Sequence, residues 1–166
     1  MKIDYCRESE KFRPKQIKTL LVGEAPPPGG DKYFYVPCSI PLRGPVELDR
    51  SLPATIFNHF FQSRPADATE YLDMLCRLQQ LGIFLVDICE EPVRVRNNPA
   101  GLMRIVSEIP LLRERLLARG ITVDDKAIIF LLARRNYAAN IRQEFPTSTL
   151  VRWIDFRIRG RRFKRV

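Results

Sequence analysis

Four short apolar runs, separated by segments with helical periodicity, constrain the fold of this chain more than any other feature. The runs are dominated by apolar residues, which is typical of strands that are buried on both faces of a parallel sheet. The runs cover residues 17–22, 83–88, 127–132 and 150–154. Because parallel strands require crossover connections, we expect the segments between them to cross the sheet as helices.

The intervening segments carry helix start and stop signals. Asp67 and Glu70 form a capping-box pattern, Gly82 follows as a stop, and Pro110 predicts a kink or a restart within a longer helical segment. The predicted helices cover residues 53–61, 67–81, 98–119 and 134–144, whereas residues 1–16 are polar and expected to be peripheral and residues 37–52 are read as a long ordered loop. The pattern predicts one α/β domain over residues 1–166, a three-layer α/β/α sandwich with a central four-stranded parallel sheet.

The charge of the chain is strongly basic and concentrated at one end. Lys and Arg number 28 against 19 Asp and Glu, a net charge of +9. Residues 152–166, named the basic tail here, supply +6 of this charge through Arg152, Arg157, Arg159, Arg161, Arg162, Lys164 and Arg165 against Asp155. Such a cluster favours a nucleic-acid partner. The alternatives are a solvated tail that aids solubility and an acidic membrane or protein surface as partner.

Hydropathy and cysteine spacing exclude several other classes of protein. No segment reaches the roughly 18 apolar residues of a membrane span, and the N-terminal stretch has no apolar signal core, so we expect a cytoplasmic protein, nucleoid-associated if the source is bacterial. The four cysteines are widely spaced without a CxxC pair, so we expect reduced thiols and no metal or cofactor. They are Cys6, Cys38, Cys76 and Cys89.

The strongest candidate for a catalytic residue is Glu24. It directly follows the first predicted strand, on a turn bounded by Gly23 and Pro26. In open α/β sheets the ligand site lies beyond the carboxyl ends of the strands, so this turn would mount a carboxylate at the active edge. The structural alternative is an ordinary solvated glutamate at a strand end.

The segment Gly23-Glu24-Ala25-Pro26-Pro27 resembles the first motif of the uracil-DNA glycosylase superfamily, and is most similar to the GEAPG motif of the family 4 enzymes. The resemblance extends to the order of elements over residues 17–154, with only this motif specific in sequence. It implies a uracil-DNA glycosylase-like fold and an enzyme that flips a base out of DNA and hydrolyses its N-glycosidic bond, without a metal in the chemistry. It also implies DNA rather than RNA as the partner.

The resemblance implies roles for individual residues. Glu24 matches the carboxylate that assists the water or the oxocarbenium-like sugar, and the backbone at Ala25 would approach the flipped base. Phe34 matches the aromatic that stacks on the base, with ordinary core packing as the alternative. Asp87 stands where the family usually has an Asn that reads the base edge. Because an ionised Asp only accepts hydrogen bonds, either Asp87 is protonated, or the base offers donors such as an exocyclic amine, or the pocket does not read uracil.

Two features depart from the family pattern. The family usually has a His after the fourth strand, but the chain's single histidine, His59, lies far upstream and is expected to be structural. Arginines stand in that place, with Phe156 or Ile158 as a possible wedge between bases. The phosphate-binding candidates are Arg157, Arg159, Arg161, Arg162, Lys164 and Arg165. Family 4 enzymes also hold an iron–sulfur cluster through four cysteines that begin with a close pair, and without that pair we expect no cluster here.

Three functions fit these observations. The first is a glycosylase that removes a damaged or deaminated base, with Glu24 as the catalytic carboxylate. The second is a non-catalytic nucleic-acid-binding relative that keeps the fold and the basic tail. The third is a hydrolase of a small nucleoside or nucleotide. The residues themselves indicate neither the base recognised, nor whether the target is DNA or RNA, nor the oligomeric state.

Overall fold

A five-stranded sheet forms the centre of the protein. A computed structural model describes residues 3–29, 32–37, 51–95, 97–132, 135–152 and 164–165. The strands lie in the order β2-β1-β3-β4-β5, and the first four are mutually parallel. Their bounds are Ile17–Gly23 for β1, Ile83–Asp87 for β2, Val123–Leu131 for β3, Thr149–Arg152 for β4 and Lys164–Arg165 for β5. The predicted four-stranded parallel sheet is confirmed, and β5 adds an antiparallel edge strand that was not predicted.

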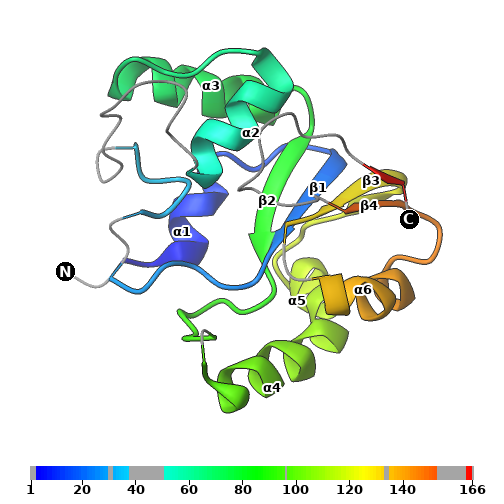
Figure 1. The fold of residues 1–166 in the computed structure, drawn as a ribbon. Coiled ribbons are helices and arrows are strands. Elements are labelled where there is room, and N and C mark those ends of the chain that lie inside the picture. The colour runs from blue at the N-terminus through cyan, green and yellow to red at the C-terminus, as the bar shows by residue number, and fades with distance from the viewer. Residues whose placement is uncertain are drawn as a thin grey trace.

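The helices cover both faces of the sheet. Their bounds are Tyr5–Glu10 for α1, Leu52–Phe61 for α2, Ala68–Gln80 for α3, Pro99–Glu108 for α4, Leu112–Ala118 for α5 and Ala138–Glu144 for α6, with 3-10 turns at Ile109–Leu111 and Arg135–Tyr137. The chain moves from β1 to β2 in one direction and then back across β1 to β3 and β4. Right-handed crossovers therefore place α2 and α3 on one face and α4 to α6 on the other. Figure 1 shows this division, with α1 beside α2 and α3.

Local signals explain the helix boundaries. The side chain of Asp67 accepts hydrogen bonds from the backbone N–H groups of Thr69 and Glu70, at 2.8 and 2.9 Å. The carboxylate of Glu70 accepts one from Ala66 N–H at 2.7 Å, which completes a capping box for α3. Pro110 lies in the 3-10 turn between α4 and α5, as its position in the sequence predicted.

The core lies on both sides of the sheet and is built from the apolar strands. Leu20, Leu21 and Val22 of β1 are fully buried. Aromatic side chains extend the core on the α2 and α3 side, where Tyr71 and Phe57 pack edge to face with ring centroids 4.9 Å apart. This packing holds the carboxyl ends of the strands in place, and the candidate site is built from residues at those ends.

Two predictions about chain segments are wrong. The segment 1–16 is not peripheral, because it forms α1 and buries Ser9 and Phe12 against the rest of the protein. The third strand begins at Val123 rather than at Ala127, since Val123 already pairs with Ile17 of β1, before an irregularity in the register between Ile17 and Thr19. Most of the expected loop 37–52 lies outside the described residues.

Candidate functional site

The carboxyl ends of β1 and β3 form a topological switch point. The connection after β1 leads to α2 on one face, and the connection after β3 leads to α6 on the other. Ligand sites in open α/β sheets lie in the crevice that such diverging connections leave. Glu24 directly follows β1, and Leu132 N–H donates to the carbonyl of Val22 at 2.9 Å, next to this crevice. Glu24 therefore lies at the edge of the sheet where a ligand is expected.

The structure brings Glu24 close to Asp87. Asp87 is the register partner of Gly23 at the last position of β2. Beyond the strands, Ile88 N–H donates to Gly23 O and Cys89 N–H donates to Glu24 O, each at 3.0 Å. A Cβ at position 23 would lie 2.3 Å from Asp87 Oδ1. Only glycine at this position of β1 therefore leaves room for the Asp87 carboxyl on the neighbouring strand β2. Gly23 thus allows the Asp87 carboxyl to lie beside Glu24.

The Asp87 carboxyl has an unusual protonation equilibrium. Burial raises its pKa, and the negative charge of Glu24 raises it further, from an ordinary value of 3.8 to about 7. At neutral pH a large share of Asp87 is therefore protonated. A protonated carboxyl carries one O–H donor beside a carbonyl acceptor, the same pair that an Asn amide offers.

The raised pKa makes stability depend on pH. The pKa of Asp87 is higher in the folded protein than in the unfolded chain, so folding favours the protonated carboxyl. The free energy of unfolding therefore decreases as the pH rises from about 4 through about 7. Asp87→Asn removes this loss, so we expect the variant to exceed the wild type in free energy of unfolding at pH 8 by about 1–4 kcal/mol, and by much less at pH 4.5. Urea unfolding at the two pH values measures this. An equal difference at both pH values would contradict the raised pKa, and Asp73→Asn, an exposed carboxyl on α3, is the control.

The structure places Phe34 in the core. Its side chain is 3% exposed, and its ring lies 5.0 Å from that of Tyr35 and 5.7 Å from that of Phe57. Tyr71 Oη donates to Phe34 O at 2.9 Å. In this conformation the neighbouring rings cover the face that a base would stack on. The stacking role of Phe34 stays a prediction, as does that of the half-buried Ala25, which packs against the core.

Helix α1 closes one side of the site, which the sequence analysis did not foresee. Tyr5 Oη donates to Pro27 O at 2.8 Å, and Tyr33 Oη donates to Tyr5 O at 3.0 Å. A cavity of about 20 Å³ remains between α1 and the strand ends, which is enough for about one water molecule. It is lined by Tyr5, Cys6, Ser9, Pro26, Tyr33, Leu85, Val86, Asp87, Cys89, Glu90 and Arg119. Tyr5, an aromatic residue within the polar N-terminal segment, is the one sequence signal that points to a role for α1 in this lining.

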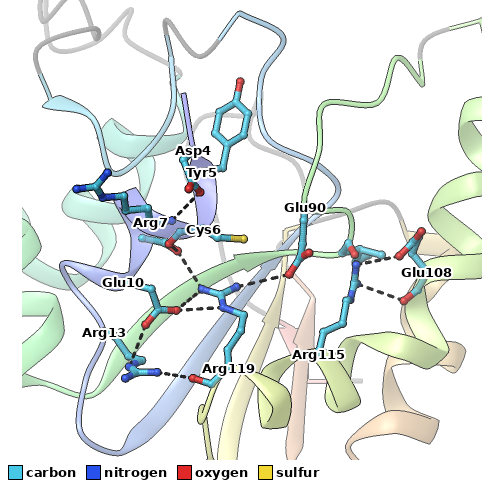
Figure 2. Close-up of polar contacts among 12 residues, drawn as sticks. Asp4, Tyr5, Cys6, Arg7, Glu10, Arg13, Glu90, Glu108, Arg115 and Arg119 are labelled. Atoms are coloured by element: carbon cyan, nitrogen blue, oxygen red, sulfur yellow. Dashed lines mark hydrogen bonds and ion pairs between the residues drawn. The ribbon is translucent and has the colours of Figure 1, made fainter. Parts of the chain in front are cut away.

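Arg115 on α5 contacts the segment that follows β2, and Arg119, directly after α5, contacts helix α1 (Figure 2). Arg115 Nη1 contacts Glu108 Oε2 at 2.8 Å, and Arg115 Nη2 donates to the carbonyl of Ile88. Arg119 Nη2 donates to Glu10 Oε1 at 2.5 Å and to Ser9 Oγ at 3.1 Å. These contacts connect α5 both to α1 and to the segment that carries Asp87.

Other candidate residues lie apart from this site or outside the described chain. His59 packs its ring against Phe60 and Phe130, and burial lowers its pKa, as fits a structural histidine. Lys164 and Arg165 lie in β5 beside β4, whereas Arg157, Arg159, Arg161 and Arg162, the wedge candidates Phe156 and Ile158, and Cys38 lie outside the described residues. Cys6, Cys76 and Cys89 are free thiols. Within the described ranges, no three His, Cys, Asp or Glu side chains gather closely enough to hold a metal ion.

Comparison with models of known protein families, with curated proteins and with solved structures finds no match to this chain. Among the helices of the described residues, none has the length and apolar character needed to cross a membrane. The geometry of the site is therefore the basis on which a function is inferred.

Proposed function

We propose that this protein is a glycosylase that hydrolyses the N-glycosidic bond of a flipped base in DNA. The observation that carries the proposal is the pair of carboxyls, Glu24 and Asp87, which lie together at the carboxyl ends of β1 and β2 beside the switch point. Their environments differ, because Asp87 is favoured in its protonated form whereas Glu24 acts on it as a negative charge. Two neighbouring carboxyls with different protonation states can take two different chemical roles.

Glu24 suits the role of the catalytic carboxylate. Cleavage of an N-glycosidic bond builds positive charge on the sugar and negative charge on the departing base. A fixed carboxylate beside the sugar stabilises that positive charge and can orient the attacking water. The backbone hydrogen bond from Cys89 N–H to Glu24 O holds the main chain at this position, which supports a fixed mount for the side chain.

Asp87 suits the role of reading the base edge. In its protonated form it donates through O–H and accepts through C=O, which matches the N3–H and O4 pattern of uracil. In its ionised form it only accepts and matches an edge with an exocyclic amine. With a pKa of about 7, the protonated form dominates below neutral pH. The proposed substrate class is therefore a deaminated base of the uracil type.

Two observations favour a second candidate function, nucleic-acid binding without base release. Phe34 is buried, and the cavity beside Asp87 is far smaller than a nucleobase. A base can enter only if side chains around the site move. Binding without any released base, unchanged in Glu24→Gln, would favour this second function, and release of a free base by the wild type supports the first.

The basic tail is proposed to bind phosphates. Each phosphate neutralised by Lys or Arg contributes about −0.9 to the slope of log affinity against log salt concentration. Replacing Arg157, Arg159, Arg161 and Arg162 with Ala is therefore expected to reduce the steepness of that slope by about 2–4 for duplex DNA. Fluorescence anisotropy over a salt series measures it. The control replaces four exposed basic residues elsewhere, Arg7, Lys15, Lys126 and Arg142, and an equal loss of slope in the control would contradict a dedicated tail site.

A further inference from the structure

Helix α1 is attached to the candidate site at two points. At its start, the Tyr5 hydroxyl contacts the loop after β1 through Pro27 O, and Tyr33 from that loop returns a bond to Tyr5 O. At its end, Glu10 contacts Arg119, which lies directly after α5. Figure 2 shows Glu10 and Glu90 on either side of the Arg119 guanidinium. The helix is thus held between the segments that carry Glu24 and Asp87.

Arg119 joins three segments of the chain. Its Nε and Nη2 donate to Glu10 Oε1 at 3.0 and 2.5 Å, its Nη2 also reaches Ser9 Oγ, and its Nη1 lies 4.0 Å from Glu90 Oε1. Arg13 adds a second layer, because its Nη1 donates to Arg119 O at 2.6 Å and its Nε lies 3.1 Å from Glu10 Oε2. The Arg119 side chain is only 22% exposed. A guanidinium with this many charged partners away from water fixes its neighbours more firmly than an exposed pair does.

Helix α1 limits how much bulk water reaches Asp87, whose side chain is only partly buried. The small cavity beside Asp87 has walls from α1, from the loop after β1, from the segment after β2 and from Arg119 itself. At about 20 Å³ it holds about one water molecule while α1 is in place. If α1 moved away, the α1 wall of this cavity would be replaced by solvent.

We propose that Arg119 is a positioning residue of the site, which holds α1 against the segments after β1 and β2 and so restricts the access of bulk water to Asp87. Only the use of Asp87 to read a base edge rests on the proposed function. The titratable and charged groups around Asp87 are Glu24 after β1, Tyr33 in the following loop, Tyr5 and Cys6 on α1, Cys89 and Glu90 after β2, and Arg119. Among these, Arg119 is the cation, and it acts through α1 because it lies against Glu10 and Ser9.

The test measures Asp87 directly, by carbon-13 NMR titration of its carboxyl in the whole protein. In Arg119→Gln we expect the pKa of Asp87 to fall from about 7 to below about 6, since solvent replaces the α1 wall. Glu10→Gln breaks the same contact from the other partner and is expected to lower this pKa in the same direction, which keeps the test valid if Arg119→Gln does not fold. Arg7→Gln, an exposed arginine of α1 that points away from the network in Figure 2, is the control and should leave the pKa unchanged.

Two results would overturn the inference. One is an Asp87 pKa that stays near 7 in both variants while amide hydrogen exchange shows that α1 has loosened. The other is faster base release in Arg119→Gln than in the wild type, because that is the behaviour of a lid and not of a fixed wall. If no variant and no wild-type protein releases a base, the proposed function fails, but the NMR titration still tests the positioning role of Arg119.

Discussion

Replacing Glu24 with Gln is expected to lower the rate of base release by about 10²–10⁴-fold. Gln keeps the shape of the side chain but carries no charge, so it cannot stabilise the positive sugar. Affinity for the oligonucleotide should change by less than about threefold, because the lost interaction develops only in the transition state. Single-turnover release of a labelled base, with anisotropy for binding, measures both quantities.

The pH of this assay matters because Glu24 also acts on Asp87. Removing the Glu24 charge is expected to lower the pKa of Asp87, so the comparison belongs at pH 5.5, well below the wild-type value of about 7. Glu91→Gln, an exposed glutamate in the segment after β2, is the matched control and should release base at the wild-type rate. A Glu24→Gln variant as fast as this control would remove Glu24 from the chemistry.

Release of uracil is expected to fall as the pH rises above about 7, by about tenfold for each further pH unit. The physical reason is that an ionised Asp87 has lost the O–H donor that the uracil O4 requires. Asp87→Asn has a permanent donor and acceptor, so this variant should keep the low-pH rate and lose the decline. Single-turnover rates between pH 5 and pH 9 measure the profile.

Asp87→Ala separates base reading from any general effect of pH. It has no group to pair with the base and should be slow throughout the pH range. A decline above pH 7 that persists in Asp87→Asn would place the responsible ionisation elsewhere. Preference of the wild type for a base with an exocyclic amine at high pH would agree with reading by the ionised form.

The elements that the sequence predicted well are those whose signals are local. The apolar runs of β1 and β2, the capping box at Asp67 and Glu70, and the break at Pro110 each depend on neighbours in sequence. Their parallel pairing follows from the alternation of strands and helices. The position of Glu24 at the carboxyl edge of the sheet follows in turn, since it comes directly after β1.

The features that the sequence missed depend on contacts between distant segments. Helix α1 is short and polar, and its packing rests on Arg119, more than a hundred positions away. Phe34 lies in an aromatic run whose composition does not say which ring faces the core, and the structure buries all three. The protonation of Asp87 could not be chosen from the sequence, because it requires the distance-dependent effect of Glu24 together with burial.

The central claim is that the wild-type protein releases a base, and a panel of labelled oligonucleotides tests it most directly. The panel holds uracil, hypoxanthine, xanthine and alkylated bases in duplex and single-stranded form at pH 5.5 and pH 8, with free base detected by mass spectrometry. The account predicts release of uracil that is faster at pH 5.5 and slowed by about 10²–10⁴-fold in Glu24→Gln. Salt-dependent binding with no base released from any substrate at either pH would contradict it and favour a nucleic-acid-binding protein.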